Sequence, residues 1–281
     1  MKFYYVTEKM TSNLLDVELE DILATTMAEN GEELLVVNPS RGTIEAVVGV
    51  ATSSKGESQK IRVLADERTL KDVMDDFIVA SNAADLIDED VLELRTLREI
   101  PENSLLITAD RVIAIVQAGS EVGGLTAEDG SFVDAAYETY TDNWERAHPF
   151  SLRTPPLSRV RRTLEDEINP EVEDDFTSVL DSLETARGNG DGLDEVTISL
   201  LVAAKNEALL YDISKWGEDV GIASKATFSR TKTKLEDMGL LDTEKVPIDV
   251  GRPRLRLKLG DDRLRGADSD QLASVAQSIL N

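Results

Sequence analysis

The order of helical and extended segments in the last third of the chain constrains the fold more than any other feature. Apolar residues recur at helical spacing over 193–207 and again over 209–220, where Gly221 ends the second stretch. A third helix is expected over 224–238. Two helices joined by a tight, glycine-containing turn, after an initial helix, form a helix-turn-helix pattern.

A β-hairpin is expected directly after the third helix. Its strand candidates are 246–250 and 255–259, and the turn between them is 251–254. Ser224 is placed to cap the third helix. Three apolar residues of that helix fall on the side expected to face the core: Phe228, Leu235 and Met238. Three helices followed by a hairpin are the order of a winged helix.

The third helix carries bases and no acids in its first three turns, although the chain as a whole is strongly acidic. The stretch 223–235 contains Lys225, Arg230, Lys232 and Lys234, whereas the complete sequence has a formal net charge of −25. A helix in the major groove of DNA passes between phosphates. A carboxylate there is repelled, while Arg, Lys, Ser and Thr can donate hydrogen bonds. For such a helix taken alone, a solvated basic face is the alternative.

The hairpin supplies a second basic cluster around Pro253, which stiffens the tip. Arginines on a hairpin tip suit contact with phosphates or with a narrow minor groove. Two basic clusters on one side of a winged helix therefore favour DNA binding. The predicted DNA-binding residues are Ser224, Lys225, Thr227, Ser229, Arg230, Thr233 and Lys234 of the helix and Arg252, Arg254 and Arg256 of the hairpin.

The acidic composition itself has a simple interpretation. The 55 acids outnumber the 30 bases, they are spread along nearly the whole chain, and Lys is scarcer than Arg. This pattern is typical of the solvated surface of a halophilic protein and unlike an acidic tail that binds basic partners. The global charge then says little about the partner, and local departures from the acidic background carry the information.

Strand and helix candidates alternate in the first half of the chain. Buried strands are expected at 31–40 and 60–67, a helix at 66–86, and further strands at 91–100 and 104–116, the last folded as a hairpin. This alternation predicts an α/β N-terminal domain with a largely parallel sheet. A helical linker and a C-terminal winged helix-turn-helix complete the expected fold class.

Proline- and glycine-rich segments suggest the domain boundaries. We expect an α/β sensor-like domain over 1–155, a helical linker over 156–192, and a winged-helix DNA-binding domain with a C-terminal helix over 193–281. The first nine residues read as an upstream start or a tag.

The linker contains an apolar stripe at helical spacing. This stripe either packs against the N-terminal domain or joins two chains in a dimer, and the sequence leaves both open. Its residues are Phe176, Val179, Leu180 and Leu183. The final helix, 268–280, either closes the winged-helix core or pairs two protomers.

Several classes of site are excluded or unsupported. The chain has no cysteine, which excludes disulfides and thiolate chemistry, and His148 is its single histidine. No apolar run approaches the roughly 18 to 20 residues that a membrane span needs. The sequence therefore predicts no metal, no cofactor, no membrane contact and a cytoplasmic location.

Four segments resemble the haloarchaeal TbsP family of transcriptional regulators. They are MTSNLL at 10–15, HPFSLRTPPLSRVRRTLEDE from His148, the stretch 197–259, which begins TISLLVAAKNEALLYDISKWGEDVGIASKATFSRTKTKL, and the closing DQLASVAQSIL. The resemblance covers nearly the whole chain from Met10 and is specific over 197–259. It implies a haloarchaeal regulator of metabolic genes that binds promoter DNA through the C-terminal winged helix.

The N-terminal domain resembles the phospholipase-D-like sensor module of the TrmB family of archaeal sugar-responsive regulators. The resemblance is carried by SLLITADRVIAIV, GGL and AAYETYTDNWERAHP. The catalytic form of that fold needs a His, a Lys two residues later and an acid further on. Ser104 and Leu106 stand at the first two positions, although Asp110 remains. A regulator is therefore expected, not an enzyme. The alternatives are a phospholipase-D-like phosphodiesterase or nuclease, and an adaptor that binds another regulator.

The expected partners follow from this interpretation. They are double-stranded promoter DNA, a second copy of the chain, a second transcription regulator and an unidentified small-molecule effector at the N-terminal domain. High salt weakens phosphate contacts by suppressing counterion release, so a halophilic regulator depends more on base contacts and on dimer avidity. We expect a dimer whose recognition helices enter successive major grooves, about 34 Å apart.

Overall fold

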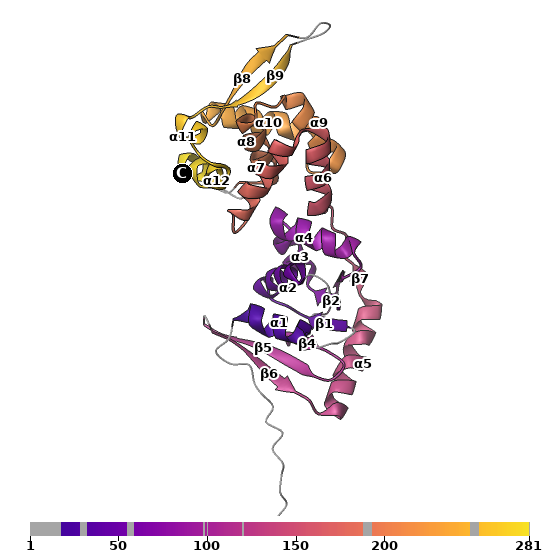
Figure 1. Cartoon of the computed structure of the whole chain (residues 1–281). Helices are drawn as coiled ribbons and strands as arrows, with labels where there is room; N and C mark the ends of the chain where they lie inside the picture. The colour runs from indigo at the N-terminus through magenta and orange to yellow at the C-terminus, as the bar shows by residue number, and fades with distance from the viewer. Residues whose placement is uncertain are drawn as a thin grey trace, which may run out of the picture. The chain divides into compact units, whose positions relative to one another are not determined.

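The computed structural model describes residues 18–28, 33–54, 59–97, 99, 101–119, 121–187, 193–247 and 253–280. The chain divides into two compact units, whose elements are labelled in Figure 1. The N-terminal unit comprises 1–73 and 86–151, and the C-terminal unit comprises 74–85 and 152–281.

The N-terminal unit is built on a seven-stranded sheet in the order β6-β5-β4-β1-β2-β3-β7. Strands β1, β2 and β3 are parallel neighbours at its centre, and the other pairings are antiparallel. The predicted α/β class is confirmed, and the sheet is mixed around a parallel core. The strands are β1 (Glu33–Val37), β2 (Lys60–Ala65), β3 (Leu92–Thr96), β4 (Leu105–Ile107), β5 (Val112–Ala118), β6 (Glu121–Ala127) and β7 (His148–Pro149).

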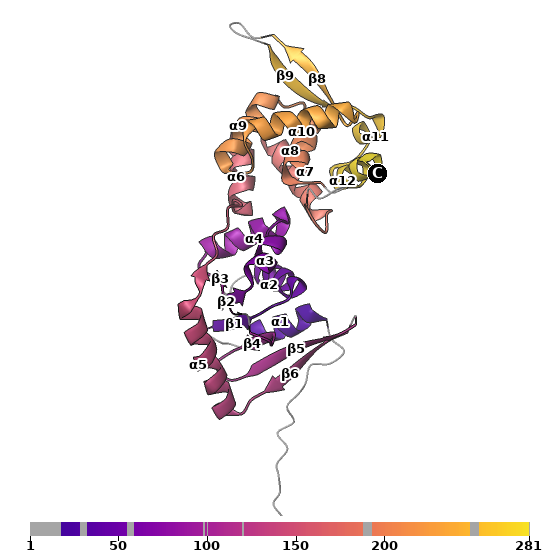
Figure 2. The same cartoon turned by 180° about the vertical axis from the view of Figure 1, so that it is seen from behind.

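Helices cover both faces of this sheet (Figures 1 and 2). Helix α5 (Gly130–Arg146) packs its Val133 and Trp144 against sheet residues such as Leu35 and Leu64. Arginines from two strands flank the Trp144 ring, with the guanidinium carbons of Arg62 and Arg95 at 5.5 and 4.6 Å from its centroid. The other helices of this unit are α1 (Leu19–Ala28), α2 (Arg41–Ser53) and α3 (Glu67–Val73).

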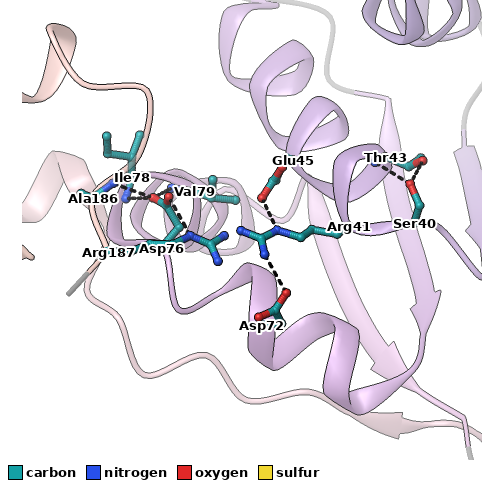
Figure 3. Close-up of polar contacts among 10 residues, drawn as sticks. All are labelled: Ser40, Arg41, Thr43, Glu45, Asp72, Asp76, Ile78, Val79, Ala186 and Arg187. Carbon is teal, nitrogen blue, oxygen red and sulfur yellow. Dashed lines mark hydrogen bonds and ion pairs between the residues drawn. The ribbon is translucent and has the colours of Figure 1, made fainter. Parts of the chain in front are cut away.

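Helix α2 begins where β1 ends. The Ser40 hydroxyl accepts a hydrogen bond from the backbone N–H of Thr43, as expected of a capping serine. Arg41 then bridges α2 and α3, because its guanidinium pairs with Glu45 at 3.0 Å and with Asp72 at 2.9 Å (Figure 3). These charges fasten the two helices beside the parallel strands.

The helix expected at 66–86 is interrupted. Helix α3 ends at Val73, and α4 (Phe77–Asp88) starts anew after Asp76, whose carboxylate accepts from the backbone N–H groups of Ile78 and Val79. The single-helix prediction was wrong at this point because Asp76 acts as a helix cap, which apolar spacing does not reveal.

Asp76 also joins α4 to the segment that follows α7, within the C-terminal unit. Its carboxylate accepts from the backbone N–H of Ala186 and from Nε of Arg187, the latter at 3.2 Å (Figure 3). The Asp76 side chain is 3% exposed and that of Arg187 is 14% exposed. Four donors around one buried carboxylate make this a rigid connection, and Phe77 beside it packs edge-on against Phe176.

Strand β6 was not predicted, because two adjacent glycines weaken a strand signal. The segment pairs with β5 over seven residues, from Glu121 opposite Ala118 to Ala127 opposite Val112. Gly119, with φ of 70°, makes the turn between the two strands.

Besides α4, most of which belongs to it, the C-terminal unit packs seven described helices and a β-hairpin around one core. Its central helix, α8, has nine buried residues out of eleven. Asp194 caps α8 by accepting from the backbone N–H of Thr197. The described elements are α6 (Leu157–Glu167), α7 (Pro170–Asp181), α8 (Glu195–Lys205), α9 (Leu210–Val220), α10 (Lys225–Asp237), α11 (Asp262–Arg265), α12 (Ser269–Leu280), β8 (Leu241–Val246) and β9 (Arg254–Leu259).

The apolar stripe predicted for dimerisation lies in the core of its own chain. Phe176, Val179 and Leu180 are at most 5% exposed, and Leu183 packs against the same cluster. Neither alternative considered for the stripe describes this arrangement, because α7 packs on helices of the C-terminal unit, including α8 and α12. The four side chains are therefore occupied within one chain and offer no free surface to a second copy.

Helix α12 closes this core. Leu272, Ala273 and Ala276 are buried in the same cluster as the α7 stripe. Asp175 of α7 accepts a hydrogen bond from the hydroxyl of Ser269, the first residue of α12, and another from the Asn206 amide after α8. The final helix was expected either to close the winged-helix core or to pair two protomers, and its described residues close the core.

Candidate nucleic-acid interface

Helix α10 is held against α9 by a close contact that only glycine permits. A Cβ on Gly217 of α9 would lie 2.3 Å from Cζ of Phe228. Phe228 is fully buried and Leu235, two turns later, is 2% exposed, so one side of α10 is fixed in the core. Gly221, with φ of 99°, ends α9 and starts the turn to α10. The predicted helix-turn-helix is confirmed in these details.

The opposite side of α10 faces solvent and carries polar residues. The exposed face contains Ser229, Arg230, Thr233 and Lys234, all expected at the DNA. Met238, expected in the core, is 39% exposed because the helix ends at Asp237 and the chain turns away. The outer face thus presents two bases and two hydroxyl groups, a set that can donate to phosphates and base edges.

The N-terminus of α10 is already occupied by side chains of the same chain. The Ser224 hydroxyl accepts from the backbone N–H of Thr227, and their two hydroxyls lie 3.0 Å apart. The Glu218 carboxylate of α9 accepts from the backbone N–H of Lys225 and pairs with its Nζ at 2.8 Å. Hydrogen bonds from the Lys225 side chain and backbone hold the pKa of Glu218 below its usual value. A carboxylate thus lies where a helix end favours an anion.

The bases of β9, the second strand of the wing, also have acid partners. Arg254 pairs with Asp212 at 3.2 Å and lies over the Tyr211 ring, with its guanidinium carbon 4.6 Å from the centroid. Arg256 pairs with Glu207 at 3.9 Å. These acids stand at the two ends of the α8–α9 turn, so that turn and the wing form one charged surface.

The wing begins earlier than the sequence suggested. Strand β8 covers Leu241–Val246 and pairs with β9 in register from Leu241 opposite Leu259 to Val246 opposite Arg254. The predicted first strand, 246–250, is therefore shifted, because β8 has only Leu241 buried and lacks an apolar alternation. Residues 248–252 lie outside the described residues, and with them the predicted contact Arg252.

Lys232 does not belong to the outer face. Its side chain is 12% exposed and pairs with Glu236 at 2.7 Å, one turn further along α10. Glu236 also accepts from the Thr243 hydroxyl of β8. Lys232 therefore joins the helix to the wing.

Two predicted contacts on α10 differ from the other bases of this surface. Among the described residues, Arg230 and Lys234 have no acidic partner. Arg230 donates one long hydrogen bond of 3.4 Å to the Thr227 hydroxyl. Both side chains are exposed and lie one helical turn apart, so they form the unneutralised positive part of the outer face.

Sequence reasoning missed the acids that neutralise this surface and the aromatic ring beside the wing. Tyr211 is 49% exposed and its ring supports Arg254. No spacing along the chain links residues 211 and 254, so only the fold brings them together.

The described part of the chain was also searched for a metal site, for a phospholipase-D-like catalytic site and for a membrane span. No group of three or more His, Asp and Glu side chains could hold a metal ion there. At the positions that correspond to phospholipase-D-like catalysis, Leu106 is buried in β4 at 1% exposure. No described helix is long and apolar enough to cross a membrane.

A groove of about 540 Å³ lies between α5 and the sheet in the N-terminal unit. Apolar side chains from β4, β5 and β6 line one wall, and Ala135, Ala136 and Phe132 of α5 line the other. The alanines leave space that larger side chains would fill. The lining contains no charged residue.

Family comparisons cover nearly the whole chain. The model of the N-terminal domain of TbsP-like transcriptional regulators matches residues 11–155. The model of the C-terminal helix-turn-helix domain of the same regulators matches residues 156–277. No curated protein matches the chain.

Two solved structures are similar to parts of the chain. TrmBL2, described as an archaeal chromatin protein with a novel mode of DNA binding, is 17% identical, with a TM-score of 0.35 over 52% of this chain and 57% of TrmBL2. NucT from Helicobacter pylori is 13% identical, with a TM-score of 0.35 over 50% of this chain and 98% of NucT. At these scores neither similarity carries an argument.

Proposed function

This chain belongs to the TbsP-like transcriptional regulators, and we propose that it reads promoter DNA with the outer face of α10 while the wing contacts the flanking backbone. The observation that carries the proposal is the pair of unneutralised bases on α10. In a chain with a net charge of −25, Arg230 and Lys234 are exposed one turn apart with no acidic partner in the described residues. Phosphate is the ligand that this arrangement suits best.

The residues between and beside these two cations recognise the DNA bases. Ser229 and Thr233 lie on the same exposed face as Arg230 and Lys234. Hydroxyl groups donate to and accept from base edges, and arginine can bind guanine with two hydrogen bonds. We assign Arg230 to a base edge or a phosphate and Lys234 to a phosphate.

Three further predicted cations exchange a carboxylate partner for a DNA phosphate when the protein binds. Lys225, Arg254 and Arg256 are held by Glu218, Asp212 and Glu207 in the free protein. These ion pairs are solvent-accessible and individually weak, so a DNA phosphate can replace the carboxylate. The pairs keep the side chains extended towards one surface and reduce non-specific attraction to polyanions.

We also propose that the chain is not an enzyme. A phospholipase-D-like phosphodiesterase needs a nucleophilic histidine near a lysine. The single histidine, His148, is exposed in the short strand β7, and its backbone carbonyl accepts from Thr96. Purified protein incubated with phosphodiester substrates and divalent metals should release no product, and turnover abolished by His148→Ala would contradict this.

The proposal further includes a homodimer on a two-fold DNA site, located in the cytoplasm where the DNA is. A small-molecule effector or a second regulator modulates it through the N-terminal unit. The family supports DNA as the partner. The dimer and the modulators are our inference from the regulatory role, and titration of DNA binding with cell metabolites tests the effector directly.

A salt titration of DNA binding tests the interface. Each phosphate contact contributes about −0.9 to the slope of log K against log salt. In a dimer, Arg230→Ala with Lys234→Ala removes up to four contacts, so the slope should become shallower by as much as about 3.6. The matched control is Arg159→Ala, which removes an exposed base of α6 outside the outer face. An unchanged slope in the double variant would contradict the assignment.

A further inference from the structure

The groove between α5 and the sheet has the size of a small-molecule site. Its volume of about 540 Å³ lies within the roughly 300–1,000 Å³ that is usual for such sites. Helix α5 is anchored to the sheet by Val133 and Trp144, which are 2% and 1% exposed. The α5 residues that line the groove are spaced so that they share one face of the helix: Phe132, Ala135, Ala136, Thr139 and Tyr140. We call this cavity the α5 groove.

The α5 groove is uncharged in a chain that is 30% charged. Residues 112–127, which supply much of the sheet wall, contain Glu121 as their single charged residue. Two large apolar side chains border the groove and are half exposed, Leu125 at 46% and Phe132 at 54%. A molecule that covers them removes apolar surface from water, which favours its binding.

The sheet wall of the groove is one face of the β5–β6 hairpin. Ala114 lies opposite Leu125 and Val112 lies opposite Ala127, and all four side chains line the groove. Thr126, between two lining residues, points to the other face because side chains alternate along a strand. Among the described residues, none of α1 lines the groove. The outer edge of β6 is therefore not part of the site.

Three polar side chains line the groove and give it hydrogen-bonding capacity: Asn103, Thr139 and Tyr140. The Thr139 hydroxyl donates to the backbone carbonyl of Ala135 at 2.7 Å, so its oxygen can still accept. In the described part of the chain, no hydrogen bond engages the side chains of Asn103 and Tyr140. The Tyr140 ring packs against the core beside α5, which fixes the position of its hydroxyl.

We propose that the α5 groove binds an uncharged small molecule that has an apolar ring system and one hydroxyl group. An anion would find no base in the lining and would be repelled by a net charge of −25, while a cation would find no carboxylate there. The hydroxyl group pairs with the polar side chains. This gives a site and a chemical class to the effector included in the proposed function, and its regulatory role rests on that function.

Three probes with the same ring system test the chemical class. They are 2-naphthol, naphthalene and 2-naphthoate, each titrated into the full chain with labelled methyl groups and followed by NMR. We expect 2-naphthol to shift the methyl resonances of Leu105, Leu125 and Ala135. Naphthalene should bind about 3- to 10-fold more weakly, because it lacks the hydrogen bond. The carboxylate of 2-naphthoate should weaken binding by about 10-fold or more.

Two variants test the location of the site. Ala135→Leu fills the groove from an exposed position, and Ala24→Leu makes the same change at an exposed position of α1 as the control. Ala135→Leu should weaken 2-naphthol by about 10-fold or more, while the control binds like the wild type. Tyr140→Phe should weaken 2-naphthol by about 3- to 10-fold and leave naphthalene unchanged.

Several results would overturn the proposal. They are the absence of any groove shift with 2-naphthol, equal binding by Ala135→Leu, and binding of 2-naphthoate as tight as that of 2-naphthol. Groove resonances that follow protein concentration and ignore the probe would show a second copy in the groove, which also overturns it.

DNA binding measured on the same samples separates this proposal from the proposed function. Saturating 2-naphthol should change the affinity for promoter DNA by about 5-fold or more in the wild type and leave that of Ala135→Leu unchanged. If the probe binds and the affinity for DNA stays constant, the regulatory role is contradicted. If the groove binds the probe in a protein that ignores every DNA, the DNA-reading proposal fails while the groove site stands.

Discussion

The contact between Gly217 and Phe228 allows a sharp prediction about how the two helices meet. Replacing Gly217 with alanine would place a methyl group 2.3 Å from one ring carbon of Phe228 and 2.4 Å from another. Ordinary contact begins near 3.4 Å, so the ring must withdraw by roughly 1 Å. The ring is fully buried among core side chains and has no free space to enter.

The expected effect is a loss of stability in the C-terminal unit. Overpacking of a core costs about 1–3 kcal/mol, and the better helix propensity of alanine returns about 1 kcal/mol. Because the overlap is large and backbone-anchored, we expect a cost above that range and a net loss of about 2 kcal/mol. Thermal unfolding followed by circular dichroism should then show a midpoint lowered by roughly 4–8 °C.

The control is the same substitution where space is free. A Cβ on Gly49, within α2, would meet no atom within 4 Å. Gly49→Ala should therefore raise stability, by about 0.5–1 kcal/mol. Gly217→Ala that unfolds at or above the wild-type temperature would refute the packing of α9 against α10, and with it the placement of the outer face.

Three further predictions concern charged groups. Asp76→Ala should destabilise the C-terminal unit by about 2–4 kcal/mol in denaturant unfolding, because it removes both the cap of α4 and a buried acceptor for the backbone N–H of Ala186; a loss below about 1 kcal/mol would contradict these buried hydrogen bonds. Glu218→Gln should tighten DNA binding about 2- to 5-fold per subunit in anisotropy titrations, because Lys225 is released from its carboxylate; weaker binding would show that Glu218 positions Lys225 for the DNA. Hydrogen bonds from the Arg263 side chain and backbone lower the pKa of Asp261 from 3.8 to about 2. A depressed folded-state pKa gives stability that is present above about 4 and lost as the pH falls towards 2, so Asp261→Asn should flatten that part of the acid unfolding curve, and an unchanged curve would refute it.

Local signals in the sequence predicted most of the C-terminal unit. Asp194 and Ser224 mark the starts of two helices, and Gly221 marks the end of another. Such signals can be read from single residues because caps and left-handed glycines act only on the neighbouring backbone. The outer face of α10 followed from the same reasoning, because a helix with Phe228 and Leu235 buried must expose the residues opposite them.

The features that escaped prediction depend on contacts distant in sequence. The break at Asp76 comes from a local cap, but the same carboxylate also meets Arg187, over a hundred positions away, and that contact has no signal along the chain. The α7 stripe looked available to a partner because its covering helix, α12, follows ninety residues later. Strand β6 needs β5 beside it to be recognised, since two glycines weaken any strand signal.

In the candidate site, too, the local features were predicted and the contacts distant in sequence were not. The sequence identified the cations of α10 and the wing by their contrast with the acidic background. It did not reveal that Glu218, Asp212 and Glu207 hold three of those cations in the free protein. Which cations are paired with acids is a property of the fold, and among the predicted contacts that the structure describes, Arg230 and Lys234 have no acidic partner.

The most direct test of the central claim is a chromatin immunoprecipitation map of the tagged protein in its own cells. The wild type is compared with the double variant Arg230→Ala and Lys234→Ala, and with Arg159→Ala as the control. We predict discrete promoter peaks for the wild type and the control, and their loss in the double variant at equal protein abundance. Peaks that persist in the double variant would contradict DNA reading by the outer face of α10. A folded wild type without peaks would contradict the claim that the chain regulates transcription by binding promoter DNA.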